Sequence, residues 1–104
     1  MADGPHRLYS WQPRLASKAR LRWDKVENQY MLVFPEAALV LNQTAAEVLK
    51  LCDGDRSVTD IIDTLLEKFT ETKREQIEEH VVELLTRIHN RGLLETGLET
   101  ESGS

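Results

Sequence analysis

The stretch Tyr30–Leu41, YMLVFPEAALVL, decides how this chain folds. It predicts two short strands, Tyr30–Phe34 and Ala37–Leu41, separated by Pro35-Glu36, because proline cannot donate a hydrogen bond to a ladder. An antiparallel sheet usually turns one face to water, and its strands then alternate apolar and polar residues. Here both strands are apolar at nearly every position. A 104-residue chain can hardly cover both faces, so we expect an exposed apolar edge where a peptide adds on.

A further strand and a hairpin turn are expected just before this stretch. Leu21 and Trp23 alternate with charged residues, which is typical of a strand. The turn is predicted at Glu27–Gln29, because Asn28 tolerates a positive φ. Alternate strand residues point to opposite faces, so within Ala37–Leu41 either positions 37, 39 and 41 or positions 38 and 40 face the core. The sequence leaves this choice open.

After these strands the apolar period changes from two residues to about 3.6, which indicates helices. Each predicted helix begins at a residue that can cap it. The first begins at Asn42 or Thr44, the second at Ser57, and the third at Thr72, which fits a capping box with Glu75. Gly54 and Gly92 are expected just past the ends of the first and third helices. The order predicts an α+β fold: a three-stranded antiparallel sheet followed by a three-helix bundle, winged helix-turn-helix-like.

The chain has the length of one domain. We expect a flexible N-terminal extension at residues 1–13, a folded domain at residues 14–95 and a disordered acidic tail at residues 96–104. Cys52 is the only cysteine and lies on the apolar face of the first helix, which indicates a buried structural thiol. No apolar run is long enough to cross a membrane, and a single cysteine fits the reducing cytoplasm, where we expect the protein.

The patterns that enzymes use are missing from the sequence. It has no glycine-rich phosphate loop, no paired-cysteine motif and no HExxH. The three histidines, His6, His80 and His89, lack the spacing of three or four residues that a helical metal site needs. We therefore expect a binding protein without catalytic residues, metal or other cofactor.

The charge of the chain bears on its partners. A net charge of −5 argues against nucleic acid and against anionic membranes as ligands. The winged-helix outline nevertheless makes a DNA-binding regulator the alternative function. Against it, the second helix has only Lys68 as a basic residue, whereas a recognition helix offers several such groups to DNA. A structural subunit whose edge strand pairs permanently with a copy or a partner is a third hypothesis.

Three segments resemble the PqqD family: RLRWDKV at Arg20–Val26, LVFPEAALVLNQTAAEVLKLCDG at Leu32–Gly54 and HNRGLLE at His89–Glu95. The resemblance covers roughly residues 14–95. It implies a peptide chaperone of pyrroloquinoline quinone (PQQ) biosynthesis, of the type that recognises ribosomally made, modified peptides. Such a protein binds the precursor peptide PqqA and presents it to PqqE, a radical S-adenosylmethionine enzyme that crosslinks a Glu and a Tyr within the peptide. The cofactors belong to that enzyme.

The resemblance also implies where the peptide binds. In related recognition domains the leader peptide adds a strand beside the third strand and lies against the last helix. The candidate contacts in the third strand are Ala37, Ala38, Leu39, Val40 and Leu41, and those on the third helix are Ile77, His80, Val81 and Leu84. Arg74 and Arg87 are candidates to pair with peptide carboxylates. Because the same edge can take another protomer, we expect a monomer or a weak, domain-swapped homodimer.

Overall fold

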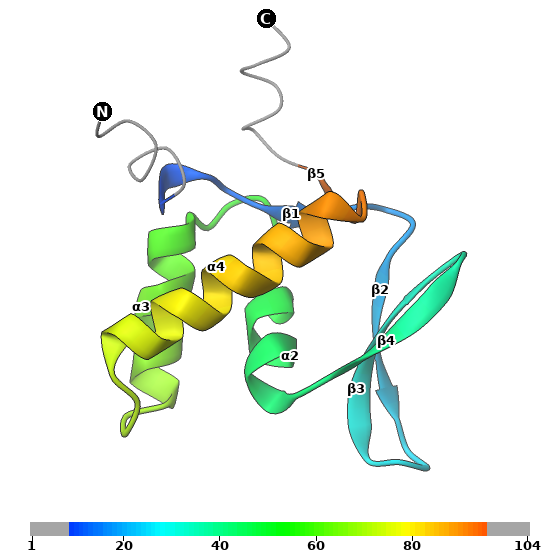
Figure 1. The fold of residues 1–104 in the computed structure, drawn as a ribbon, viewed down its shortest axis with the longest axis horizontal. Coiled ribbons are helices and arrows are strands. Elements are labelled where there is room, and N and C mark those ends of the chain that lie inside the picture. The colour runs from blue at the N-terminus through cyan, green and yellow to red at the C-terminus, as the bar shows by residue number, and fades with distance from the viewer. Residues whose placement is uncertain (1–8, 96–104) are drawn as a thin grey trace, which may run out of the picture.

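The computed structural model describes residues 9–95, a small sheet beside a cluster of helices (Figure 1). In chain order the elements are β1 (Arg14–Leu15), β2 (Arg20–Asp24), β3 (Gln29–Phe34), β4 (Ala37–Leu41), α2 (Gln43–Lys50), α3 (Val58–Lys68), α4 (Arg74–Asn90) and β5 (Leu94–Glu95). The predicted α+β fold, a three-stranded antiparallel sheet followed by three helices, is confirmed. The predicted acidic tail at residues 96–104 lies outside the described residues, as do residues 1–8.

The three-stranded sheet has the order β2-β3-β4, and both of its ladders are antiparallel. Asn28 has φ 59° in the turn between β2 and β3, as predicted. Asp24 stabilises this turn, because its Oδ1 accepts hydrogen bonds from the backbone N–H groups of Val26 and Glu27 at 3.0 and 3.3 Å. Pro35 and Glu36 form the turn between β3 and β4. β3 is therefore the central strand.

A second, two-stranded sheet was not foreseen from the sequence. β1 pairs antiparallel with β5, and Arg14 forms an ion pair of 3.1 Å with Glu95 across it. The N–H of Leu15 donates to the carbonyl of Cys52 at 3.3 Å, which ties β1 to the end of α2. Gly92, at φ 75°, lets the chain turn from α4 into β5. Strands of two residues are too short to show an alternating pattern.

The starts of α2 and α3 follow the predicted capping chemistry. Asn42, rather than Thr44, caps α2: its Oδ1 accepts a hydrogen bond from the N–H of Ala45 at 2.7 Å. Ser57 and Asp60 form a reciprocal capping box at α3, with bonds of 3.0 and 3.1 Å. Both helices are thus fixed at the residue where the preceding loop ends.

The start of α4 differs from the prediction. Thr72 still belongs to the turn that follows α3, because its N–H donates to the carbonyl of Phe69 at 3.1 Å. The helix begins after Lys73, whose N–H donates to Oε1 of Gln76 at 3.3 Å. The predicted capping box of Thr72 with Glu75 is therefore wrong.

The core lies where α2, α3 and α4 meet the inner face of β3. In Figure 1, α2 stands between the sheet and the other two helices, and so connects them. The described residues include no buried polar or charged side chain. Several apolar side chains are fully buried, at 0% exposure: Leu32, Val48, Val58, Ile61, Ile62, Val81 and Ile88.

The packed part of the chain begins before residue 14. Trp11 is only 6% exposed and belongs to the core, with its ring edge-on to that of His89 at a centroid distance of 5.7 Å. The carbonyl of Trp11 accepts a hydrogen bond of 2.8 Å from the N–H of Val58, at the start of α3. The prediction that residues 1–13 form a flexible extension is therefore wrong for residues 9–13. A lone tryptophan in a polar segment gives no periodicity, so its packing could not be inferred.

Cys52 has the structural position expected for it. Its thiol is buried and donates a hydrogen bond of 3.3 Å to the carbonyl of Val48. Burial, with a smaller contribution from the nearby Asp53 carboxylate, raises the pKa of the Cys52 thiol to about 12. The thiol is therefore protonated at neutral pH and is a poor nucleophile.

The two tryptophans give a test of the N-terminal packing. Trp11→Ala should lower the free energy of unfolding by about 3–5 kcal/mol, because it leaves a cavity in the core. Trp23 is 45% exposed and contacts Tyr30 edge-on, so Trp23→Ala should cost about 1 kcal/mol. Urea unfolding followed by circular dichroism measures both values. Equal losses for the two variants would contradict the assignment of Trp11 to the core.

Candidate functional site

β4 forms one edge of the sheet. Within residues 9–95 it pairs only with β3. Leu39 packs against the core and Leu41 is 7% exposed, whereas Ala38 is exposed and Val40 is 63% exposed. The set at positions 37, 39 and 41 therefore faces the helices, which answers the question that the sequence left open. Every second residue of an edge strand points its N–H and C=O away from the sheet, so β4 presents unpaired main-chain groups.

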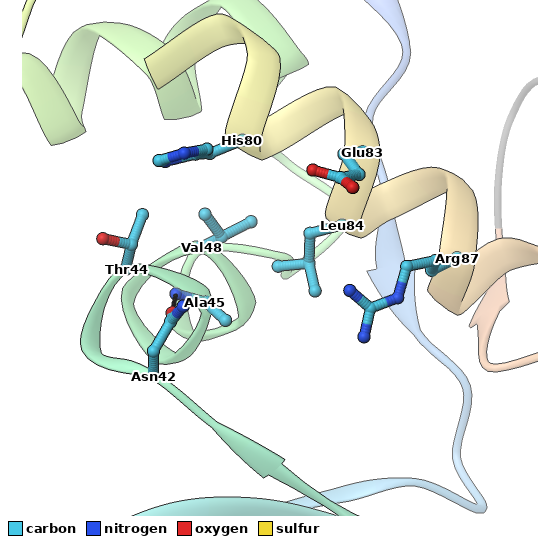
Figure 2. A pocket seen from close by; sticks show the side chains of 8 residues that line it. All are labelled: Asn42, Thr44, Ala45, Val48, His80, Glu83, Leu84 and Arg87. Carbon is cyan, nitrogen blue, oxygen red and sulfur yellow. Dashed lines mark hydrogen bonds between the residues drawn. The ribbon is translucent and has the colours of Figure 1, made fainter. Parts of the chain in front are cut away.

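A groove lies between α4 and the segment that begins where β4 ends (Figure 2). Its volume is about 110 Å³. One wall comes from α2 and its cap, with Asn42, Thr44, Ala45 and Val48; the other comes from α4, with His80, Glu83, Leu84 and Arg87. Figure 2 shows Leu84 and Arg87 reaching from α4 toward α2. The groove thus begins at Asn42, the residue that follows β4.

The groove combines an apolar floor with polar walls. Val48 is fully buried and Leu84 is 8% exposed, so both supply apolar surface at the base. His80, Glu83 and Arg87 are exposed on successive turns of α4. A peptide side chain placed here would meet apolar contact below and charged or hydrogen-bonding groups at the rim, as in most ligand sites.

The structure brings together only part of the predicted helix contacts. His80, Leu84 and Arg87 line the groove. Ile77 and Val81 are core residues at 2% and 0% exposure. They pack in the interior and do not line this groove. They lie on the same helix, but their side chains point toward the core.

The two predicted arginines have different surroundings. Arg74 donates to Asp63 and to Glu78, each at 3.0 Å, and these two hydrogen bonds, that to Asp63 first, raise the pKa of its guanidinium. Arg87 takes part in none of the ion pairs among residues 9–95 and lines the groove. The thirteen-residue separation places the two arginines about 20 Å apart along α4. The geometry therefore favours Arg87 over Arg74 as a peptide contact.

Five groove residues were missed by the sequence reasoning: Asn42, Thr44, Ala45, Val48 and Glu83. The sequence spacing indicates that some of them lie together. Positions 80, 83, 84 and 87 fall on one face of a helix, as do positions 44, 45 and 48. Nothing in the sequence, however, tells which face of α2 meets which face of α4. That depends on the angle at which the helices pack.

The sheet is also held against α2 by electrostatic contacts. Nζ of Lys50 lies 4.5 Å from the centre of the Tyr30 ring and 3.2 Å from Oε2 of Glu47. Lys68 reaches the other oxygen of Glu47 at 3.3 Å, which links α2 to α3. Tyr30 first, and then Glu47, raise the pKa of Lys50. Of these contacts, only that of Lys50 with the Tyr30 ring joins α2 to the sheet, and at an exposed site such a contact contributes about 0.5–1 kcal/mol.

The side chains of the site are suited to binding a ligand. Among residues 9–95 there is no group of three or more His, Cys, Asp or Glu side chains that could hold a metal ion. No helix in that part of the chain is long and apolar enough to cross a membrane. The exposed face of α4 carries Glu75, Glu79 and Glu83, which would repel the phosphates of DNA. The alternative prediction of a DNA-binding regulator thus gains no support from the longest helix.

Several known proteins are similar to this chain in sequence. Residues 29–94 match the sequence model of the family described as "Coenzyme PQQ synthesis protein D (PqqD)". A "PqqA binding protein" of Rhodopseudomonas palustris strain HaA2 is 39% identical over 83 residues, covering 80% of each chain. The "PqqA binding protein" of Methylococcus capsulatus is 36% identical over 92 residues, covering 88% of this chain and 91% of that protein.

Two solved structures are also similar. The solution NMR structure of the PqqD truncation of Methylobacterium extorquens PqqCD, described as a stand-alone recognition element for ribosomally synthesised, modified peptides, has a TM-score of 0.69 and 34% identity. It covers 80% of this chain and 87% of that one. The crystal structure of PqqD from Xanthomonas campestris has a TM-score of 0.54 and 33% identity, covering 78% and 89%. Sequence and fold together show that the chain belongs to the PqqD family.

Proposed function

We propose that this protein is a peptide chaperone of PQQ biosynthesis, which binds the precursor peptide PqqA and presents it to the radical S-adenosylmethionine enzyme PqqE. One observation carries the proposal: among the described residues β4 is an open sheet edge, and Asn42, the residue that follows it, lines a groove against α4. The names of the relatives, "PqqA binding protein", support the identity of the peptide. The chaperone itself performs no chemistry, and it works in the cytoplasm.

The peptide binds as an added strand beside β4. Main-chain groups of Ala37–Leu41 that point away from β3 pair with the peptide backbone, whatever the peptide side chains are. Each such hydrogen bond contributes about 0.5–1.5 kcal/mol net. Ordering a flexible peptide costs part of this free energy, so the affinity is moderate. The same open edge can pair with another protomer, and a weak or domain-swapped homodimer would then compete with the peptide.

Selectivity comes from the peptide side chains that face the helices. Alternate residues of the added strand point to the side of Leu39 and Leu41, where the groove lies. An apolar peptide side chain fits over Leu84, and a peptide carboxylate fits the unpaired Arg87. His80 supplies a hydrogen-bonding group at the rim. Arg74 contributes at most a contact at the far end of α4, since two carboxylates already hold it.

Proline substitutions test strand addition. Of the adjacent residues Leu39 and Val40, one directs its N–H to β3 and the other directs it outward, because neighbours in an antiparallel strand alternate. Proline at the outward position removes a donor that the peptide needs but leaves the β3–β4 ladder intact. Proline at the inward position instead removes a donor of the β3–β4 ladder and distorts the strand. Leu39→Pro and Val40→Pro should therefore each weaken PqqA binding about tenfold, or about 1.4 kcal/mol, in isothermal titration calorimetry.

The matched controls are Arg22→Pro and Trp23→Pro in β2, at the opposite edge of the same sheet. Far-ultraviolet circular dichroism shows which variants remain folded. Folded β2 variants should bind the peptide as the unmodified protein does. If folded β4 variants bound as tightly as folded β2 variants, strand addition at β4 would be the wrong mode of binding.

A pair of neutral variants tests the proposed carboxylate contact. Arg87→Gln should weaken PqqA binding about threefold to tenfold, because it removes a partly exposed charge-assisted hydrogen bond. Arg74→Gln should change the affinity less than twofold, since Arg74 is engaged with Asp63 and Glu78. Added salt should weaken binding by the unmodified protein more than by Arg87→Gln. Equal effects of the two substitutions would contradict the role given to Arg87.

A further inference from the structure

The face of the sheet turned away from the helices is apolar at its centre. Cross-strand pairing arranges its side chains in two rows. One row runs from Arg22 on β2 through Met31 on β3 to Val40 on β4, and the other runs from Arg20 through Val33 to Ala38. In each row an exposed arginine stands at the β2 edge and an exposed apolar residue stands at the β4 edge. We call these six residues the outer face.

This outer face differs from the solvent face of an ordinary antiparallel sheet, which is polar. Met31 and Val33 are only half-buried, and Val40 is 63% exposed. A hollow of about 430 Å³ beside β2 is lined by Arg22, Met31 and Val33, together with Trp23, Asp24 and Lys25. Exposed apolar surface bordered by polar groups is typical of a surface that another protein covers.

The charges at the rim of the outer face point to an acidic partner. Among residues 9–95, Arg20 and Arg22 take part in none of the ion pairs, although the chain as a whole has a net charge of −5. Lys18 and Lys25 are exposed nearby and are likewise free of ion pairs in this part of the chain. An apolar patch ringed by carboxylates on a second protein would complement this surface in both respects.

Strand addition at β4 would enlarge the outer face. The side chains of an added strand alternate, so about half of them point away from the helices. The peptide residues opposite Val40 and Ala38 would each add one side chain to the end of a row. The bound peptide therefore lies in the same surface as Met31 and Val33. A protein that covered this surface would contact the chaperone and the peptide at once.

We propose that the outer face is the docking surface for the enzyme that receives the peptide, and that this enzyme presents an apolar patch ringed by carboxylates. The proposal rests on the peptide-binding function given above. Because the peptide completes the surface, the enzyme binds the loaded chaperone more tightly than the free one. By linkage, the enzyme also tightens the hold of the chaperone on the peptide by the same factor.

Charge reversal at the rim tests this proposal. The variant Arg20→Glu/Arg22→Glu is compared with Lys73→Glu/Arg91→Glu, which changes the net charge equally at the two ends of α4, where both side chains are exposed and lie outside the outer face. A third variant, Met31→Gln, makes the centre of the outer face polar. Affinity for labelled PqqA is measured first, and affinity of the peptide-loaded chaperone for PqqE is measured second.

The two measurements separate this proposal from the proposed function. We expect all three variants to bind PqqA within about twofold of the unmodified protein, because none of the substituted residues lies on β4 or lines the groove. Arg20→Glu/Arg22→Glu and Met31→Gln should bind PqqE at least about tenfold more weakly, and the control variant should bind it normally. Failure of the unmodified protein to bind PqqA would overturn the proposed function itself. Intact PqqA binding with unchanged PqqE affinity would overturn only the docking surface.

Sedimentation of the same samples decides between a partner enzyme and a second copy of the chain. We expect the unmodified protein and Arg20→Glu/Arg22→Glu to have the same oligomeric state. A dimer that this variant alone dissociates, together with unchanged PqqE affinity, would mean that the outer face pairs two protomers. That result would also overturn the docking proposal.

Discussion

The position of the edge strand β4 depends on the pairing of β3 on both of its sides. β3 takes β2 on one side and β4 on the other, and its inner face contributes the buried Leu32 and Phe34 to the core. The sheet ends there, so among the described residues β4 has a partner on one side only. An unpaired edge is ordinarily a risk for aggregation. In this protein the residue that follows β4, Asn42, lines a groove, and we infer that the open edge serves binding.

We infer that α2 and α4 give the open edge its specificity for a peptide. α2 begins two residues after the end of β4, with Asn42 as its cap, so the strand leads directly into one wall of the groove. α4 supplies the other wall, and its position depends on core residues such as Val81 and Ile88 that no ligand touches. The contact of Lys50 on α2 with the ring of Tyr30 on β3 joins the sheet to α2. The proposed binding site thus combines one strand edge with the faces of two helices.

The sequence predicted the parts of this structure that depend on local signals. Pro35 marked the turn after β3, Asn28 marked the hairpin, and Ser57 marked the start of α3. It could not predict what depends on contacts between distant segments. The packing of Trp11, the pairing of β1 with β5 and the direction in which Leu39 points are set by residues far away in the chain. The same limit explains why Ile77 and Val81 were placed in the groove, whereas Asn42, Thr44 and Val48 were missed.

The central claim, a peptide strand added to β4 against α4, is tested most directly by amide NMR. The labelled protein is titrated with PqqA, and the shift of each amide signal is mapped on the structure. We expect the amide shifts to be concentrated in Ala37–Leu41 and between His80 and Arg87, and the signals of α3 to be unaffected. Shifts that avoided β4, or no shifts at all from a sample that sediments as a monomer, would contradict it.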